Sequence, residues 1–420
     1  MTPFTRPVKF AEAAGEALAG PRRDPRPAAE RQRRRAEAVA ELPGWEDLRR
    51  AGEELKDRAL LDLGTLLERL EDAVVRAGGK VHWARDAAEA ARVVTRLVQA
   101  GGREEVVELA SAVTREIGLA GALAAAGITV RGAELSPRER LLSVETVVSG
   151  AHFLVAETGT VVALEPEEDG RMCLVLPETL ITVAGIEQVV PRLRDLEVLL
   201  QLLARSSGER MSPHTAMWAG TTAGDGPREF HLVLLDNGRT AVLKDEVGRA
   251  ALRCIGCSAC LDVCPVYGRV GARPYGDLPG PIGAILTPQL RGIEPAYEAS
   301  LPFASTLCGA CADVCPVRID IPGVLVHLRA KVVESRRRRP VPTPELALMR
   351  AAAWTMSDRR RYERALARLN RWGGLLARGG GVRGLSGLSG LSILSGRWTD
   401  ARDLPVLPRR TFRDWWRSRR

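Results

Sequence analysis

The spacing of apolar residues along the chain changes near residue 80. Between residues 60 and 74, apolar side chains recur at intervals of three and four, which places them on one face of a helix. They are Leu60, Leu63, Leu67, Leu70 and Val74. Gly78 and Gly79 follow and are expected to end that helix. The pattern predicts a helical segment over residues 1–79.

Short apolar runs alternate with amphipathic stretches after residue 80. Strands are predicted at 81–84, 104–110 and 128–135, with helices at 86–102 and 114–127 between them. This alternation is typical of parallel βαβ units and predicts an α/β layer architecture over residues 80–245. Further strands are predicted at 152–157, 160–165, 172–177, 181–186 and 230–236, and a helix over 187–206.

The remaining chain is cysteine-rich at first and then basic. Cysteines crowd into a segment over 246–335, which a stretch rich in proline and arginine, SRRRRPVPTP, follows. A helical stretch at 345–377 precedes a short Gly-Leu-Ser repeat at 379–396, which is predicted to be a flexible linker. Residues 336–420 therefore form a basic C-terminal region of helices and linkers.

Composition narrows the class of protein. The 420 residues are 45% hydrophobic and 27% charged, which suits two or three globular domains. We expect no transmembrane helix, because no window of about 18 apolar residues occurs, and no signal peptide at the start. Seven of the eight cysteines lie between residues 254 and 315. This clustering indicates metal ligation in a reducing, cytoplasmic compartment rather than a disulfide framework.

The net charge of +9 is concentrated in arginine runs at 21–35, at 335–340 and at the C-terminus. Solvated faces are the favoured interpretation; the alternatives are docking at the inner membrane face and binding of nucleic acid. Nucleic acid is disfavoured because aromatic residues make up only 4% of the chain and do not interleave with these runs. The aromatic tail is predicted to dock on another surface. It carries Trp398, Phe412, Trp415 and Trp416.

The first cysteine run has the spacing of a bacterial ferredoxin. It reads C-x2-C-x2-C-x3-C-P, in which the first three cysteines bind one cubane cluster and the fourth binds the other cluster. The run contains Cys254, Cys257, Cys260 and Cys264, followed by Pro265. A zinc site is the alternative, but a zinc ribbon needs two separated cysteine pairs, so the spacing favours iron–sulfur chemistry.

The second run lacks one cysteine. Ser305 stands where its first cysteine is expected. The crossing pattern assigns cluster 1 to Cys254, Cys257, Cys260 and Cys315, and cluster 2 to Cys264, Cys308 and Cys311. The fourth ligand of cluster 2 stays open between the Ser305 hydroxyl, an external ligand or solvent, and a three-iron cluster. We take a four-iron cluster with one non-cysteine ligand as the hypothesis. The 43 residues between the two runs predict a helical, expanded ferredoxin-type domain.

These runs and the segments around them resemble the lactate utilisation protein B family of the bacterial L-lactate oxidation system. The matching segments include KVHWARDAAEA at 80–90, AETGTVV at 156–162, GPIGAILTP at 280–288 and FRDWW near the end. The resemblance covers most of residues 40–335 and the tail. It implies two [4Fe-4S] clusters, and as partners a cysteine-rich heterodisulfide-reductase-like protein and a second lactate-utilisation-domain protein.

The resemblance also implies that residues 80–245 are the lactate-utilisation domain, with a fold like those of CoA transferases and sugar-phosphate isomerases. Here that α/β domain is abridged, because the chain lacks several tens of residues after GITVRGAEL. The segment ELASAVTREIGL carries no lysine, and Gln188 stands where the family has one. The ferredoxin-type motifs are complete apart from Ser305. The resemblance therefore implies electron transfer more directly than a small-molecule pocket.

Two turns supply candidate substrate-binding residues. Glu157, Thr158 and Gly159 lie between two predicted strands, and Asp236, Asn237 and Arg239 follow another strand, where α/β proteins usually bind ligands. Arg239 suits bidentate binding of a carboxylate, although the favoured interpretation is turn chemistry with a surface arginine. His231, His82 and His152 are interpreted as core histidines, and Cys173 as a buried thiol. No catalytic residue is assigned.

The leading hypothesis is an iron–sulfur electron-transfer subunit of a multi-protein, cytoplasmic system that oxidises L-lactate to pyruvate, delivering electrons to a partner or to the quinone pool. In the second hypothesis, the α/β domain itself binds a small carboxylate or acyl substrate and the clusters serve as its redox outlet. A regulatory or nucleic-acid-binding protein with structural clusters is the third.

Overall fold

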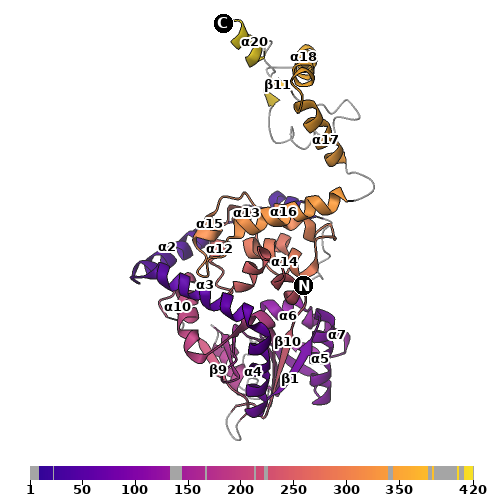
Figure 1. Ribbon diagram of the computed structural model, residues 1–420. Coiled ribbons are helices and arrows are strands. Elements are labelled where there is room, and N and C mark those ends of the chain that lie inside the picture. Colours follow the sequence, from indigo (N-terminus) through magenta and orange to yellow (C-terminus); the bar gives the residue numbers. More distant parts are fainter. Residues whose placement is uncertain are drawn as a thin grey trace. The chain divides into compact units, whose positions relative to one another are not determined.

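The computed structural model shows two sheets, a helical cysteine-rich region and a C-terminal set of helices (Figure 1). Contacts divide the chain into two compact units, Met1–Val333 and Glu334–Arg420. The structure describes residues 9–21, 23–132, 144–165, 168–211, 214–221, 226–338, 344–376, 381–382, 404–405 and 411–419.

A six-stranded parallel sheet forms the centre of the first unit, with strand order β1-β10-β7-β4-β2-β3. Its strands are β1 (Lys80–Ala84), β2 (Glu105–Glu108), β3 (Thr129–Arg131), β4 (Thr146–Gly150), β7 (Thr179–Gly185) and β10 (Glu229–Leu235). On β10, Leu232 and Leu234 belong to the apolar cluster of α4 (Leu63–Arg76). Val233 and Leu235 belong to the cluster of α5 (Ala87–Ala100) and α7 (Leu119–Ala125). Both faces are thus covered, as parallel sheets require.

A four-stranded sheet, in the order β8-β5-β6-β9, connects these layers to the helical region. Its strands are β5 (Phe153–Val155), β6 (Thr160–Leu164), β8 (Val189–Val190) and β9 (Thr215–Trp218). On β5, Leu154 packs in the cluster of α4. Phe153 and Val155 pack in another cluster, together with α3 (Trp45–Leu61) and α10 (Leu196–Ser206). Alternation along one strand therefore joins two hydrophobic cores.

The cysteine-rich region consists of short helices that share this last cluster. They are η3 (Gly248–Arg253), α12 (Ala259–Asp262), α13 (Pro265–Val270), η4 (Arg273–Tyr275), α14 (Gly280–Arg291), η5 (Glu298–Phe303), α15 (Ala310–Asp313) and α16 (Ile321–Arg337). Tyr275, Ile285 and Leu325 of this region belong to the same buried cluster as Leu199 and Leu202 of α10. The helical region and the α/β part are therefore held together by one continuous core.

The N-terminal helices α1 (Phe10–Ala19), α2 (Arg26–Ala40) and α3 pack on the cysteine-rich region. The ring of Phe10 lies 4.9 Å from that of Tyr275, centroid to centroid. Arg31 of α2 forms an ion pair of 2.6 Å with Asp262 of α12. These contacts tie a segment at the start of the chain to residues more than two hundred positions away.

One carboxylate, Asp245, marks both ends of the cysteine-rich region. Its Oδ1 accepts the backbone N–H of Gly248 at 3.1 Å, and its Oδ2 accepts from His327 Nε2 at 2.9 Å and Lys331 Nζ at 2.5 Å, both on α16. Burial alone would raise the pKa of Asp245, but these partners hold it well below its usual range. The carboxylate thus fastens α16 to the segment that enters the region.

The predicted strands at 81–84, 104–110, 152–157, 160–165 and 230–236 are confirmed within a few residues. The predicted helical face is also confirmed, since all five of its apolar side chains are buried, although Asp62 separates α3 from α4. The α/β architecture with a parallel sheet is confirmed as well. The likeness to CoA transferases stays a prediction.

Other predicted elements are wrong. The run at 172–177 is not a strand but belongs to helix α9 (Glu168–Val175), in which Cys173 and Leu174 are buried and Val175 is exposed. A short apolar run cannot distinguish a strand from a helix by periodicity alone. The helix predicted over 187–206 begins only at Leu196, after η1 (Ile186–Gln188), β8 and η2 (Leu193–Asp195). Strands β4 and β9 were not predicted. The helix predicted over 114–127 is interrupted at Gly118, whose φ of 63° separates α6 (Ala112–Glu116) from α7.

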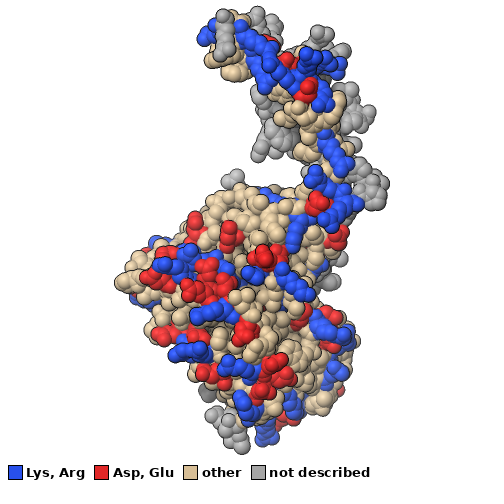
Figure 2. Space-filling model, in the orientation of Figure 1, with Lys and Arg blue, Asp and Glu red and all other residues tan. Residues whose placement is uncertain are grey.

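Charges of both signs intermix on the visible face of the first unit (Figure 2). In α2, Arg33 pairs with Glu30 and Glu37, which agrees with a solvated face, but Arg35 points into the protein. Within the part of the chain that the structure describes, no helix is long and apolar enough to cross a membrane.

The second unit contains α17 (Pro344–Met356), α18 (Arg359–Leu376), α20 (Phe412–Arg417) and a short pairing of β11 (Gly381–Val382) with β12 (Leu404–Pro405). Phe412, Trp415 and Trp416 contact one another yet remain exposed, and Arg417 pairs with Glu363 of α18. Trp398 and most of the Gly-Leu-Ser repeat lie outside the described residues. Docking of the tail stays a prediction.

Leu70 offers a test of the core beneath the sheet. Its side chain is fully buried in α4, so Leu70→Ala should lower the free energy of unfolding by about 2–5 kcal/mol through lost burial and a residual cavity. Leu61→Ala is the matched control, because Leu61 is 74% exposed at the end of α3. Urea unfolding followed by circular dichroism measures both variants. Equal losses would contradict the described packing.

Candidate metal centre and adjoining cavity

The first cysteine run begins in the loop between η3 and α12, continues through α12, which carries Cys260, and ends at Cys264, the N-cap of α13. Gly256 and Ser258 take left-handed conformations, with φ of 76° and 61°, which turn the backbone sharply between successive cysteines. Burial raises the pKa of the Cys254 thiol to about 11 and that of Cys257 to about 12. Thiols in such surroundings stay protonated unless a metal replaces the proton.

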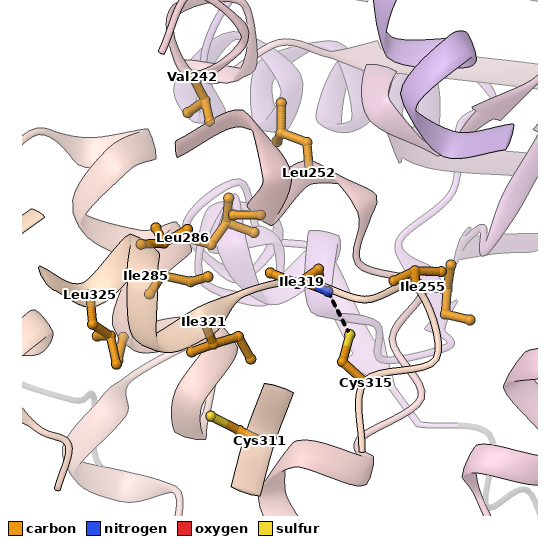
Figure 3. Close-up of a cluster of buried hydrophobic side chains, with 14 of the residues drawn as sticks. Val242, Leu252, Ile255, Ile285, Leu286, Cys311, Cys315, Ile319, Ile321 and Leu325 are labelled. Atoms are coloured by element: carbon orange, nitrogen blue, oxygen red, sulfur yellow. Dashed lines mark hydrogen bonds between the residues drawn. The ribbon is translucent and has the colours of Figure 1, made fainter. Parts of the chain in front are cut away.

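The second run returns to the same place. Cys315 is buried among apolar residues, and its Sγ accepts the backbone N–H of Ile319 at 3.4 Å (Figure 3). Cys264 Sγ likewise accepts the N–H of Tyr267 at 3.4 Å. Hydrogen bonds from amides to sulfur are one of the means by which proteins adjust iron–sulfur centres.

Mutual electrostatic effects divide the seven thiols of the two runs into two groups. Burial raises the pKa of Cys260, and the charges of Cys254, Cys257 and Cys315 raise it further. For Cys311, burial raises the pKa to about 11, with smaller contributions from Cys264 and Cys308. Cys254, Cys257, Cys260 and Cys315 also line one cavity, and the ligand assignment of both clusters stays a prediction.

Each group contains one buried thiol, Cys315 in the first and Cys311 in the second, and only the second reaches the surface, at Cys308. The first group lines a cavity. Ser305 is half-buried in the loop before Cys308, and its Oγ accepts the N–H of Leu307 at 3.1 Å. Among the residues that the structure describes, no three His, Cys, Asp or Glu side chains are arranged to hold a single metal ion.

Cationic side chains from α2 and α3 surround the first thiol group. Arg49 donates from Nε and Nη2 to the carbonyl oxygen of Cys315, at 3.0 and 2.7 Å. Arg35 donates from Nη2 to the carbonyl of Val314 at 3.0 Å. Lys56 is buried and donates from Nζ to the carbonyl of Glu187 at 2.6 Å; burial lowers its pKa to about 8.

The donors of this group fit an anionic iron–sulfur cluster. The Nε of Arg35 is buried with no hydrogen-bond partner among the described residues, and the charges of Cys257 and Cys315 act on this guanidinium. A buried N–H without an acceptor is costly, and a cluster held by thiolates supplies both an acceptor and negative charge. Cys254, Cys257, Cys260 and Cys315 would hold such a cluster.

A cavity of about 400 Å³ adjoins the first thiol group. Its opposite wall is made by the carboxyl ends of the parallel strands, the place where α/β sheets usually bind ligands. Ser149 and Gly150 come from the end of β4, Ser111 from the loop after β2, and Glu187 from the segment after β7.

Arg239, at the start of α11 (Arg239–Leu243), lies buried in the wall of this cavity. Its Nη1 and Nη2 donate to the Glu116 carboxylate at 2.8 and 2.9 Å, and its Nε donates to Glu187. Burial disfavours the charged guanidinium, but these carboxylates outweigh that effect and hold the pKa of Arg239 above its usual value. The prediction of a surface arginine is wrong. Its bidentate geometry is used within the protein, on Glu116, rather than left free for a substrate.

The other predicted substrate-binding residues do not meet at one site. Asp236 accepts the N–H of Thr240 at 2.7 Å, and Asn237 donates to Glu116 at 2.7 Å. Glu157 accepts the N–H of Leu193 at 3.0 Å in the β5–β6 turn, away from the cavity lining. In the same turn, Thr158 Oγ1 lies 2.7 Å from Thr160 Oγ1, and Gly159, with a φ of 71°, packs on the backbone of α4.

Sequence reasoning missed the residues that line the cavity, among them Ser111, Arg115, Glu116 and Glu187. The available signal was their position directly after predicted strands. His152 also lines the cavity and so is not only a core residue. His231 is buried, with Nδ1 3.0 Å from His82 Nε2, as expected of a core histidine. Cys173 is buried, and burial raises its pKa to about 11.

Comparisons with known proteins agree with this division of the chain. A family model described as "LUD domain" matches residues 67–235, and one described as "4Fe-4S dicluster domain" matches residues 250–319. The chain is 34% identical to "Lactate utilization protein B" of Exiguobacterium sp. (strain ATCC BAA-1283 / AT1b), over 92% of this chain and 91% of that protein. It is 33% identical to the protein of that name from Bacillus subtilis (strain 168), over 92% and 90% of the two chains.

Among solved structures, a duf162 family protein from Deinococcus radiodurans covers 41% of this chain and 98% of its own, at 20% identity. The TM-score of that comparison is 0.33.

Replacing Arg239 should strongly destabilise the fold, because two carboxylates would lose the cation beside them. We expect Arg239→Met to lower the free energy of unfolding at pH 7 by about 3–5 kcal/mol. Arg239 holds the pKa of Glu116 below its usual value, so in the parent this pair stabilises the fold above the unfolded pKa and less as the pH falls. In the variant, burial raises that pKa, so the difference between the two proteins should narrow from pH 7 to about pH 5.

Thermal unfolding across this pH range measures the difference. Arg85→Met is the control, because Arg85 forms an exposed pair with Glu89 and should cost only a small fraction of that loss. A difference that widens toward pH 5 would contradict the assigned network.

Proposed function

Because the chain belongs to the lactate utilization protein B family, we propose that it is the iron–sulfur electron-transfer component of a multi-protein system that oxidises L-lactate to pyruvate. The match to a 4Fe-4S dicluster domain supports iron–sulfur clusters at residues 250–319. A [4Fe-4S] cluster, when bound, supplies a centre that gains or loses one electron. Lactate oxidation releases two electrons, and two such centres have the capacity for both.

The observation that carries the proposal is the unequal placement of the two thiol groups. The first group lines the cavity at the end of the sheet, with Cys315 buried, whereas the second group reaches the surface at Cys308. A path from interior to surface is what a protein that passes electrons to a partner needs.

The surface around Cys308 is suited to contact with such a partner. Phe303 is 47% exposed and Leu307 is 37% exposed beside it. Arg329 of α16 lies over the Phe303 ring at 5.3 Å and donates to the carbonyls of Pro302 and Ser305. The proposed partners are a cysteine-rich heterodisulfide-reductase-like protein and a second lactate-utilisation-domain protein.

For cluster 2 we propose a four-iron cluster whose fourth ligand is not a cysteine. The position of Ser305, half-buried and three residues before Cys308, supports its hydroxyl as the candidate. An external ligand or solvent is the alternative.

The direct test is the visible spectrum of the anaerobically purified protein with co-expressed partners, before and after L-lactate is added. Brown absorbance that bleaches with lactate supports the proposal. Brown absorbance that does not respond would remove the chain from the path of lactate electrons. A colourless protein that contains zinc would overturn the iron–sulfur assignment.

Single cysteine variants test the crossing of ligands. Cys315→Ala should abolish the electron paramagnetic resonance signal of cluster 1, and Cys308→Ala that of cluster 2, each with a loss of about four iron atoms per chain. Cys173→Ala should keep both clusters, since Cys173 lies in α9, outside both thiol groups. If the Cys315 and Cys308 variants lose the same cluster, the predicted ligand sets of clusters 1 and 2 are wrong.

Arg35 should raise the reduction potential of cluster 1. Its half-buried cation and the unpaired N–H at its buried Nε favour the more negative, reduced state, so Arg35→Leu should lower the midpoint potential of cluster 1 and leave that of cluster 2 unchanged. Arg33→Leu is the control on the same helix, because Arg33 pairs with Glu30 and Glu37 on the exposed face. Potentiometric titration followed by paramagnetic resonance reads both clusters in one sample. If the difference between the midpoint potentials of the two clusters is the same in Arg35→Leu as in the parent, this role of Arg35 is refuted.

A further inference from the structure

The cavity at the carboxyl edge of the sheet contains hydrogen-bond donors that the protein itself does not use. His152, between β4 and β5, is the first. Its Nδ1 accepts the N–H of Leu164 at 3.2 Å, so the neutral ring carries its hydrogen on Nε2. Burial lowers the pKa of His152 and favours this neutral form. No described residue accepts a hydrogen bond from Nε2, and the ring lines the cavity.

Arg115 is the second donor. It lies on α6, lines the cavity and is also exposed to solvent, so it marks the opening. Its guanidinium forms no ion pair with any carboxylate that the structure describes. Arg239, by contrast, is saturated by Glu116 and Glu187. The cation at the mouth is therefore available to an incoming anion.

The carboxylates of the wall do not exclude an anion. Arg239 compensates Glu116 and lies against Glu187, and the buried Lys56 adds a second positive charge beside Glu187. The remaining carboxylate of the lining, Glu165, packs against Gly170 of α9. Two of the three carboxylates in the lining therefore have a cation beside them.

The size of the cavity limits the ligand. Its roughly 400 Å³ includes the space between Cys254, Cys257, Cys260 and Cys315, part of which a cluster would fill. What remains admits a molecule of a few heavy atoms, enclosed between the strand ends and the thiols.

We propose that this cavity binds a small 2-hydroxy or 2-oxo carboxylic acid, with Arg115 recognising its carboxylate and the Nε2–H of His152 its neighbouring oxygen. The proposal rests on the proposed function and extends it, because it places the organic acid on this chain, next to cluster 1, rather than on a partner. L-lactate and pyruvate share this binding chemistry.

Titration calorimetry on the anaerobic, cluster-loaded, full-length protein tests it, with L-lactate, pyruvate and the uncharged lactamide as separate ligands. Saturable binding of one or both acids, and none of lactamide, is expected. Arg115→Gln and His152→Gln should each weaken binding about tenfold or more, since each removes a hydrogen bond, one of them to a charged group. Arg92→Gln, on the exposed side of α5, should bind as the parent does.

Paramagnetic resonance of the reduced protein supplies the second readout. A bound acid should change the line shape of cluster 1 and leave cluster 2 unaltered, and an unchanged ligand-free spectrum shows that each variant is folded. Clusters that are present and reducible without any acid binding would overturn this site and leave electron transfer standing. Acid binding that Arg115→Gln does not weaken would also overturn it. A chain without clusters would instead refute the proposed function, while calorimetry still reports on the site.

Discussion

The meeting of Cys315 with Cys254, Cys257 and Cys260 is the constraint on which the rest of the structure depends. The four thiols come from two places in the chain, yet they line one cavity. To bring them together, the chain between the runs folds back through α13, α14 and η5, and this fold-back supplies much of the largest hydrophobic cluster. Left-handed residues at Gly256 and Gly309 allow the tight loops. The same fold-back therefore both buries apolar side chains and positions the cysteine sulfur atoms.

The N-terminal helices belong to this centre, although α1, α2 and α3 precede both matched family regions. They bring cations to a place where anionic sulfur would otherwise be poorly solvated. Arg49 binds the carbonyl of Cys315, and Lys56 reaches the segment after β7. The helices thus act as part of the cluster environment rather than as an appendage.

The spacing of residues within one segment was enough to predict most of the strands and the α3–α4 apolar face, because both depend on local periodicity. It could not predict the partners of Arg239, which lie 123 and 52 residues away. It also could not show that His152 has a free nitrogen at a cavity, since that depends on the strand β6 that pairs beside it. The α9 helix was missed for a related reason: only tertiary contact decides which of its apolar residues is buried.

The role of Asp245 also bears on where the cysteine-rich region lies. A single carboxylate binds the residue three positions along the chain and two side chains of α16, more than eighty positions later. The two ends of the cysteine-rich region therefore lie next to each other. All strands of the two α/β sheets precede this region, and one continuous core joins it to them. Its adjacent ends therefore fix where the region lies on the α/β part, and one carboxylate holds both of them in place.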